Sequence, residues 1–206
     1  MEVVLLAHTP NPEEICALAM RSCRSTLPAH KIKLDEQTVK KLVRKAVDSG
    51  HFSILEHASF TFSIRGISRS CTHQLVRHRL ASFSQQSQRT IYLSRSDIND
   101  LFIFPKSFTK PQTEKQYREA LERSISAYKN FISRGVPLED ARFILPNAIK
   151  TNIVITMNAR ELLHFFKLRT AKEAQWEIRE LANKMLDACR EKAPIIFEDI
   201  SEAETS

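Results

Sequence analysis

The spacing of apolar residues along the chain changes from segment to segment, and it predicts where the strands lie. Residues 2–8 form a run of β-branched residues and leucine, which predicts a buried strand. Residues 58–67 alternate phenylalanine and isoleucine with polar side chains, which is the period of a half-buried strand. A third apolar run predicts a strand over residues 147–157, and short extended pieces are expected at residues 90–95 and 101–105.

Other segments carry apolar residues three and four positions apart, which predicts amphipathic helices. The predicted helices are residues 13–24, 36–49, 113–134 and 173–192, with shorter ones over residues 68–79 and 136–146 and after Asn158. Asp35 and Asn158 stand where a side chain caps the following helix, and Thr170 with Glu173 repeats the arrangement of Asn158 with Glu161. Because strands and helices mix without regular alternation, the sequence predicts an α+β fold with a central, mostly antiparallel sheet flanked by long helices.

The length and composition fit one globular domain. The 206 residues are 42% hydrophobic, so we expect a single domain over residues 1–206, with a frayed tail from about residue 201. No apolar run approaches the length of a membrane span, and residues 1–10 are too short for a signal peptide. The four cysteines form no CxxC pair, so we expect reduced thiols, no metal site and a cytoplasmic protein.

The charge and the glycine content limit the ligands that the chain can bind. A formal net charge of +7 fits polyanionic partners, which are either nucleic acid or phosphorylated small molecules. The chain has only three glycines, so it contains neither a GxGxxG fingerprint nor a P-loop. Any nucleotide must therefore be held by side chains and helix N-termini.

Residues 72–89 concentrate more polar donors than folding alone requires. If the first part of this stretch is helical, Gln74, Arg77 and His78 fall at i, i+3 and i+4 and share a face that can bind an anion. The Ser/Gln run that follows offers hydroxyls and amides to a neutral pyrimidine edge, and Arg89 adds a guanidinium for phosphate. These residues predict a small phosphorylated ligand. The alternative is a solvated basic helix end with a polar loop, or a surface for nucleic acid.

The same stretch resembles the signature of a known family. The triplet Arg-His-Arg at residues 77–79 is followed by seven residues and then Ser87, and this spacing resembles the signature of the flavin-dependent thymidylate synthases. The Gln-Arg pair at residues 88–89 also follows that serine in many members. The family often has an aromatic residue next, whereas this chain has Thr90 and only then Tyr92.

Three further segments resemble the same family in the same order. The predicted loop over residues 51–57 contains a histidine, a hydroxyl residue and a Glu-His pair, like the family's segment beside the flavin. Residues 141–146 resemble its Ala-Arg-x-x-Leu-Pro element, whose arginine contacts the nucleotide. Residues 158–160 and 168–177 resemble its third block. A coincidence of all the segments is improbable.

The resemblance implies a reaction and a set of site residues. The reaction is the reductive methylation of dUMP to dTMP, with 5,10-methylenetetrahydrofolate as carbon donor, FAD as cofactor and NADPH as the source of hydride. The residues it assigns to dUMP are Gln74, Arg77, Ser87, Gln88, Arg89, Arg142 and Arg169. The residues it assigns to FAD are His51, Ser53, Arg77, His78, Arg79, Gln85, Asn158 and His164, with Glu56 in support. It also implies a homotetramer with shared active sites, whose partners are small molecules rather than nucleic acid or a membrane.

The residue types indicate how the chemistry is divided. A serine without an adjacent general base is a poor nucleophile, and no cysteine lies near an obvious base in the sequence. We therefore predict that Ser87 and Arg169 are the catalytic residues, which position and polarise the pyrimidine while reduced flavin supplies hydride. Two alternatives stay open. One is a basic nucleic-acid-binding protein, which the placement of most phenylalanines in apolar runs disfavours; the other is a different flavin reductase, which dUMP dependence would distinguish.

Overall fold

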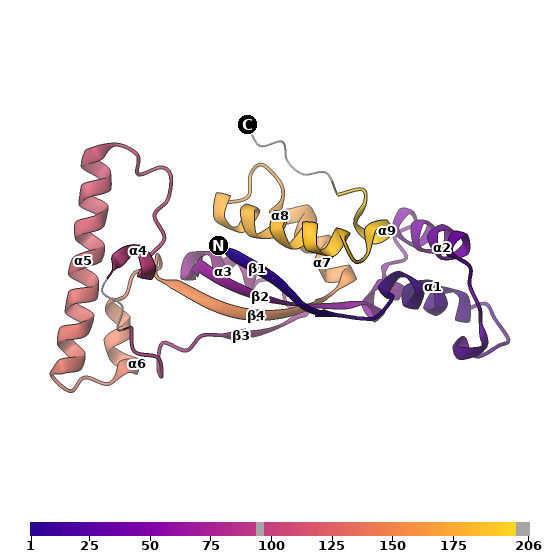
Figure 1. Cartoon of the computed structure of the whole chain (residues 1–206), viewed down its shortest axis with the longest axis horizontal. Coiled ribbons are helices and arrows are strands. Elements are labelled where there is room, and N and C mark those ends of the chain that lie inside the picture. The colour runs from indigo at the N-terminus through magenta and orange to yellow at the C-terminus, as the bar shows by residue number, and fades with distance from the viewer. Residues whose placement is uncertain (94–96, 201–206) are drawn as a thin grey trace. The chain divides into compact units, whose positions relative to one another are not determined.

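The computed structural model describes residues 1–93 and 97–200, and its strands form one antiparallel sheet. The strands are β1 (Glu2–His8), β2 (Ser59–Ser68), β3 (Ala81–Gln85) and β4 (Lys150–Asn158). Hydrogen bonds join them in the order β1-β2-β4-β3 (Figure 1). The three strands predicted over residues 2–8, 58–67 and 147–157 are therefore confirmed to within a few residues, but the prediction that the first is buried is wrong, because β1 lies at an edge of the sheet and none of its residues is buried.

The long helices lie where the apolar spacing predicts them. The helices are α1 (Pro12–Ser22), α2 (Glu36–Asp48), α3 (Arg69–Leu75), α4 (Ile98–Leu101), α5 (Pro111–Ser133), α6 (Leu138–Ala141), α7 (Ala159–Arg169), α8 (Trp176–Arg190) and α9 (Pro194–Phe197). Short 3-10 helices are η1 (Ala29–Lys31), η2 (Phe52–His57) and η3 (Arg142–Ile144). The predicted α+β fold is confirmed. Of the helices described, none is long and apolar enough to cross a membrane.

The residues group into two compact units that interleave along the sequence. Unit 1 consists of Met1, Arg65–Gln74 and Ser84–Ile153. Unit 2 consists of Glu2–Ile64, Leu75–Phe83 and the chain from Val154 onward. Strands β2, β3 and β4 each contribute residues to both units, so neither unit is a continuous piece of chain. The extent of one domain over residues 1–206 stays a prediction.

Helix α5 contributes Leu121, Ile125 and Tyr128 to a buried apolar cluster of unit 1. It begins at Pro111, whose fixed φ suits the first turn of a helix, and Gly135 follows its end with a φ of +87° that favours glycine. Its inner face packs against α4 and the segments that follow α4 and α6. The buried residues of this cluster are Ile98, Leu101, Phe102, Leu121, Ile125, Tyr128, Ala141 and Ile149. The amphipathic helix predicted over residues 113–134 is thus confirmed.

In unit 2, α8 packs against β1 and lies beside α7 (Figure 1). The buried apolar residues of α8 are Ile178, Leu181, Ala182, Met185, Leu186 and Cys189. The carboxylate of Glu13, on α1, accepts hydrogen bonds from the backbone N–H groups of Ile195 (2.5 Å) and Ile196 (3.2 Å) at the start of α9. The core of unit 2 is therefore closed by elements that are far apart in the sequence.

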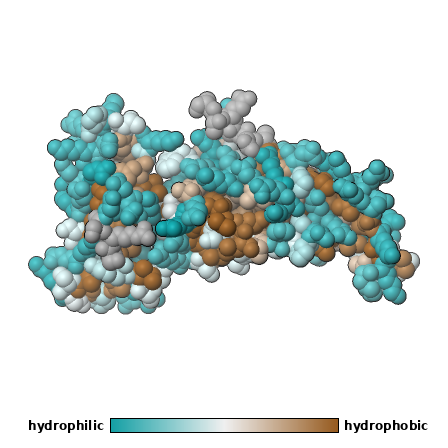
Figure 2. Space-filling view, in the orientation of Figure 1, coloured by the Kyte–Doolittle hydropathy of each residue, from teal (hydrophilic) through white to brown (hydrophobic). Residues whose placement is uncertain are grey.

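Strand β1 forms one edge of the sheet and carries apolar side chains on its surface. Val4 is 46% exposed and Leu6 is 56% exposed, and Figure 2 shows apolar surface over this strand. An exposed apolar edge strand is a surface on which another chain can pack.

One predicted helix is shorter than its pattern. Helix α3 ends at Leu75 instead of continuing to residue 79, so the prediction that Gln74, Arg77 and His78 share one helical face is wrong. The backbone N–H of His78 donates to the carbonyl of Leu75 at 3.2 Å, and the His78 ring is buried with hydrogen-bond partners on α7. Those non-local partners prevail over the local helical pattern.

Other differences involve short segments. Residues 81–85 form β3, which pairs with β4, where the sequence indicated a polar loop. Residues 51–57 are not an open loop, because η2 covers most of them. The extended piece expected over residues 101–105 is reduced to a bridge between Phe102 and Ile149. Local spacing says little about such segments because their backbone partners are distant.

Of three predicted helix caps, two form and one does not. Asp35 and Asn158 cap α2 and α7, accepting hydrogen bonds from the N–H groups of residues three positions on. Thr170 does not cap α8: its hydroxyl donates to the carbonyl of Phe166 at 2.8 Å, and Gln175 caps α8 instead. The part of the extended piece at residues 94–95, and the tail from residue 201, lie outside the described residues.

Candidate active site

The predicted site residues all lie in the described parts of the chain, and they divide between the two units. Unit 1 holds Gln74, Gln85, Ser87, Gln88, Arg89 and Arg142. Unit 2 holds His51, Ser53, Arg77, His78, Arg79, Asn158, His164 and Arg169. The set predicted for dUMP thus falls mainly in unit 1, and the set predicted for FAD falls mainly in unit 2.

In unit 1, Gln85 is held from two neighbouring elements. Its side-chain Nε2 donates to the hydroxyl of Thr72 on α3 at 3.1 Å and to the hydroxyl of Thr151 on β4 at 3.4 Å. Thr72 in turn donates to the carbonyl of Arg69 at 2.9 Å. The Gln85 amide therefore has a fixed orientation at the end of β3.

Also in unit 1, three arginines and one glutamate form what we call the arginine cluster: Arg69, Arg89, Arg142 and Glu139. Arg89 donates through Nε (3.1 Å) and Nη2 (2.9 Å) to one carboxylate oxygen of Glu139. Arg142 donates through Nε to the backbone carbonyl of Glu139 at 2.9 Å. The Ser87 hydroxyl accepts a hydrogen bond from the N–H of Arg89 at 3.2 Å. Glu139, in the first turn of α6, thus contacts two predicted nucleotide-binding arginines.

Arg69 belongs to this cluster although the sequence did not single it out. Its Nη2 donates to the carbonyl of Gln86 at 2.8 Å, while its buried Nε has no acceptor among the described residues. Burial, and next the positive charge of Arg142, lower the pKa of the Arg69 guanidinium. The guanidinium groups of Arg69 and Arg142 are both positively charged and repel each other. An anion bound beside them would offset this repulsion and could accept a hydrogen bond from the Nε–H of Arg69.

In unit 2, what we call the histidine cluster consists of the buried His78 and Glu161, the partly buried Arg169 and the exposed His164. His78 Nδ1 lies 3.1 Å from Glu161 Oε1, and Arg169 Nε lies 3.1 Å from His78 Nε2. An arginine Nε–H can only donate, so His78 Nε2 must accept and the ring proton resides on Nδ1. His78 is therefore the neutral tautomer that donates to Glu161.

The electrostatics of the cluster agree with this assignment. Burial is the largest cause that lowers the pKa of His78, and the charge of Arg169 lowers it further. The hydrogen bond to Glu161 opposes these effects without overcoming them. The exposed His164 ring lies 5.7 Å from the His78 ring, and Phe165 packs its edge at 4.9 Å between centroids. The imidazole is thus enclosed and uncharged.

The remaining predicted residues of unit 2 are more accessible. Arg77, Arg79, His51 and Ser53 are exposed, and the supporting Glu56 pairs with Arg160 at 2.5 Å. Asn158 Oδ1 accepts from the N–H of Glu161 at 2.9 Å, so its oxygen is used as a helix cap. No three His, Cys, Asp or Glu side chains in residues 1–93 and 97–200 are placed to hold a metal ion.

Sequence reasoning missed three members of these clusters. Glu161 was noticed only as a cap partner, and neither Arg69 nor Glu139 was noticed as a site residue. The excess of charged residues near the signature was the only available signal, because Glu161 lies 83 positions from His78 and Glu139 lies 50 positions from Arg89.

Comparison with known proteins identifies the family. The family described as "Thymidylate synthase complementing protein" matches residues 4–195. A flavin-dependent thymidylate synthase of Geobacter sulfurreducens is 48% identical over 202 residues, which cover 97% of this chain and 86% of the relative. The chain belongs to the flavin-dependent thymidylate synthase family. The resemblance carried by the signature residues, and the prediction of an enzyme, are confirmed.

Other relatives agree with the family assignment. A flavin-dependent thymidylate synthase of Pyrococcus furiosus is 53% identical over 156 residues, covering 75% of this chain and 64% of the relative. A crystal structure of a UMP/dUMP methylase, PolB, from Streptomyces cacaoi bound with 5-Br dUMP superposes with a TM-score of 0.81 at 25% identity. That superposition covers 96% of this chain and 93% of the other.

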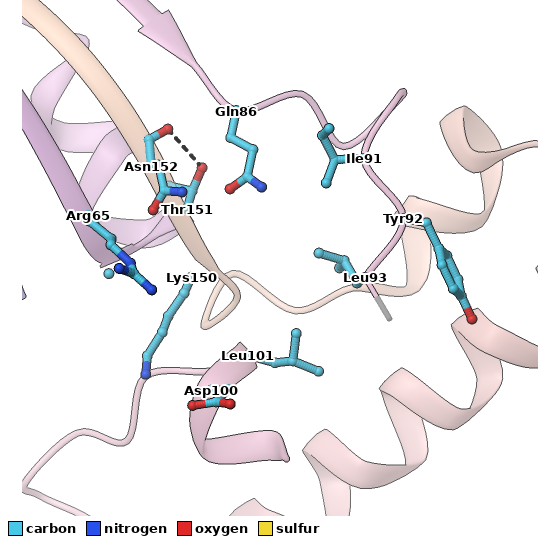
Figure 3. A pocket seen from close by; sticks show the side chains of 11 residues that line it. Arg65, Gln86, Ile91, Tyr92, Leu93, Asp100, Leu101, Lys150, Thr151 and Asn152 are labelled. Atoms are coloured by element: carbon cyan, nitrogen blue, oxygen red, sulfur yellow. Dashed lines mark hydrogen bonds between the residues drawn. The ribbon is translucent and has the colours of Figure 1, made fainter. Parts of the chain in front are cut away.

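Unit 1 also contains a pocket that is separate from the residues predicted for this family. It has a volume of about 240 Å³ and is lined by Arg65, Gly66, Gln86, Ile91, Tyr92, Leu93, Asp100, Leu101, Lys150, Thr151 and Asn152 (Figure 3). Lys150 donates to the carbonyl of Asn99 at 2.6 Å. None of the predicted site residues, all of which the structure describes, is in this lining.

Proposed function

We propose that the protein is a flavin-dependent thymidylate synthase that converts dUMP to dTMP. In this proposal 5,10-methylenetetrahydrofolate donates the carbon, FAD is the cofactor and NADPH provides the hydride. The family assignment supports the reaction class, and the PolB structure bound with 5-Br dUMP supports a deoxyuridine nucleotide as substrate. The observation that carries the proposal is the arginine cluster, in which Arg69 retains a buried, unused donor beside Arg142.

The arginine cluster suits a nucleotide monophosphate. A phosphate brings several acceptor oxygens and negative charge, which the guanidinium groups of Arg69, Arg89 and Arg142 can bind with charge-assisted hydrogen bonds. Arg89 forms an ion pair with Glu139. Because this pair is exposed, a phosphate can replace the Glu139 carboxylate as the partner of Arg89. Ser87 and Gln88 supply a hydroxyl and an amide for the neutral edge of the pyrimidine.

The residues of unit 2 suit an anionic flavin nucleotide. Arg77 and Arg79 are exposed cations that can face a diphosphate, and the rings of His78 and His164 can pack against flat groups. We propose that His51, Ser53, Asn158, and Gln85 of unit 1, complete the FAD contacts. When bound, FAD supplies the hydride-transfer chemistry.

Within this reaction, Ser87 and Arg169 position and polarise the pyrimidine. Among the described residues, the N–H of Arg89 bonds to the Ser87 hydroxyl, and no histidine or carboxylate does. An unactivated serine is a poor nucleophile, whereas it is a good hydrogen-bond partner. Arg169 keeps both terminal nitrogens for a ligand, because only its Nε is bonded within the described residues.

Assembly and location are also part of the proposal. We propose a homotetramer with shared active sites, for which the apolar edge at β1 offers a packing surface, and a cytoplasmic location. The preference for NADPH and the use of methylenetetrahydrofolate rest on the family resemblance.

The test is a visible absorption spectrum of the purified protein, followed anaerobically while NADPH is added with and without dUMP. We expect flavin bands that bleach at a rate dependent on dUMP. Bleaching that ignores dUMP would favour a different flavin reductase. A colourless protein that takes up no added FAD, and that binds nucleic acid instead, would contradict the proposed function.

A further inference from the structure

We propose that Glu161 is a positioning residue of the active site, which fixes the His78 ring and, through that ring, the guanidinium of Arg169. The inference rests on the proposed function and deepens it, because it assigns a role to a residue that contacts neither nucleotide nor flavin in that proposal. Its basis is the hydrogen-bonded chain from Arg169 through His78 to Glu161.

The direction of both hydrogen bonds that link Arg169, His78 and Glu161 is determined. Arg169 Nε–H donates to His78 Nε2, and His78 Nδ1–H donates to Glu161 Oε1, both over 3.1 Å. If the ring proton moved to Nε2, the ring would present a second donor to Arg169 and an unprotonated nitrogen to the carboxylate. Both contacts would then be repulsive. The acceptor at Glu161 therefore selects the tautomer that can receive Arg169.

Glu161 has left its expected local role to make this contact. In a capping box, the glutamate at this position reaches back to the N–H of the capping residue. Here only half of that arrangement forms: Asn158 accepts from the N–H of Glu161, while the Glu161 carboxylate bonds to His78. An exposed carboxylate at a helix N-terminus is already favourable, yet this side chain is 8% exposed. Burial of a charge requires a partner, and His78 is the partner that the structure supplies.

The geometry along α7 explains why one ring can join both residues. Glu161 and Arg169 are eight positions apart on the helix, which is about 12 Å along its axis. His78 enters from outside α7 and lies between them, against Phe165. Since Nε is held, the plane of the Arg169 guanidinium is set, and its terminal nitrogens are directed by a rigid group rather than by a free side chain.

The experiment compares Glu161→Gln with Glu161→Ala. The Gln side chain keeps an oxygen that accepts from His78 Nδ1–H, whereas Ala removes the acceptor. We expect kcat/KM for dUMP within about threefold of the wild type for Glu161→Gln, and a loss of about tenfold to a hundredfold for Glu161→Ala, as for other groups that orient a functional side chain. The exposed glutamate Glu180 on α8, changed to Ala, is the matched control and leaves the value unchanged.

A second readout separates positioning from general stability. Nitrogen NMR of the His78 ring should show protonated Nδ1 and unprotonated Nε2 in the wild type and in Glu161→Gln, and loss of that single tautomer in Glu161→Ala. Thermal unfolding identifies variants that are not folded; if Glu161→Ala is one of them, Glu161→Leu fills the space without an acceptor and replaces it.

The outcomes distinguish this inference from the proposed function. A folded Glu161→Ala protein that keeps the wild-type tautomer and kcat/KM would overturn the inference, as would equal losses in the Gln and Ala variants with no change in the ring. A wild-type protein without dUMP-dependent turnover would contradict the proposed function, while the NMR comparison would still decide whether Glu161 orders His78.

Discussion

The arginine cluster of unit 1 and the histidine cluster of unit 2 are built in opposite ways. In the first, the side chains of Arg89 and Glu139 form an ion pair that is 64% and 50% exposed. In the second, the side chains of His78 and Glu161 are only 3% and 8% exposed. The first cluster carries unmatched positive charge, while the second matches one cation with one carboxylate across a neutral ring.

This difference indicates two separate tasks. An exposed ion pair contributes only about 0–1 kcal/mol, so its partners can be exchanged for those of an arriving anion. A hydrogen bond to a buried charged group contributes about 1.5–3 kcal/mol, and leaving its partner unsatisfied costs more. We therefore propose that the arginine cluster binds the nucleotide, and that the histidine cluster holds the side chain of Arg169 in a fixed position.

The largest effect on kcat/KM is expected for a substitution of Arg169. Replacing Arg169 with Lys keeps the charge but removes the Nε–H and the planar fork, so kcat/KM for dUMP should fall on the order of 100-fold. Steady-state kinetics would measure this, with Arg179→Lys on α8 as a control that keeps wild-type values. A Lys variant with nearly normal turnover would mean that the bond to His78 has no part in the reaction.

In the arginine cluster, Arg69→Ala should weaken dUMP binding by about tenfold to a hundredfold, since one charge-assisted hydrogen bond is lost. Calorimetric titration with dUMP gives the dissociation constant, and thermal unfolding checks that the bond to Gln86 is not needed for folding. The exposed arginine Arg123 on α5, changed to Ala, is the control. Unchanged affinity in a folded Arg69→Ala protein would remove Arg69 from the site.

The neutral state of His78 predicts a pH dependence of stability. Its pKa in the folded protein is below the ordinary value of 6.5, so below pH 6.5 the unfolded chain takes up a proton before the folded protein does. The free energy of unfolding should therefore decrease as the pH falls below 6.5, with a slope of up to about 1.4 kcal/mol per pH unit from this group.

Urea unfolding across this range would measure the slope. The variant His78→Gln should have a shallower slope than the wild type, and the exposed His57, changed to Gln, is the matched control. Equal slopes in the wild type and His78→Gln would show that His78 does not change its charge on unfolding, against the assignment of a neutral ring.

The smallest effect is expected for Glu139→Gln. Loss of the exposed pair with Arg89 should change stability by less than about 1 kcal/mol, and dUMP affinity should rise about twofold to fivefold because a competing carboxylate is gone. Titrations at low and high salt would show the gain and its screening, with Glu122→Gln on α5 as the control. A fall in affinity would show that Glu139 holds Arg89 in its binding position.

The sequence was sufficient for the parts of the molecule that local spacing determines. The long helices α5 and α8 and the strands β1, β2 and β4 follow from apolar periods, and the cap at Asn158 follows from its side chain. The end of α3 at Leu75 does not, because the burial of His78 against α7 decides it. Local pattern and distant partner conflict at that point, and the conflict falls at a predicted site residue.

The candidate site shows the same limit. The segments that resemble the family contain Arg89 and Arg142 of the arginine cluster and His78, His164 and Arg169 of the histidine cluster, yet they do not show that Glu161 bonds to His78 or that Glu139 contacts two arginines. Such pairings depend on where the fold brings distant segments together. They follow from the places that α7 and α6 take in the fold.

The closing of unit 2 by α8 and α9 has a consequence for the synthesis of the protein. Strand β1 and helices α1 and α2 leave the ribosome first, but α8, which covers β1, and α9, which binds Glu13, come near the end of the described chain. Before α8 and α9 are synthesised, α1 can already pack against α2, but the face of β1 that α8 covers stays open to solvent. Folding of this unit is therefore completed only after most of the described chain has been translated, and until then the open face of β1 can take part in aggregation.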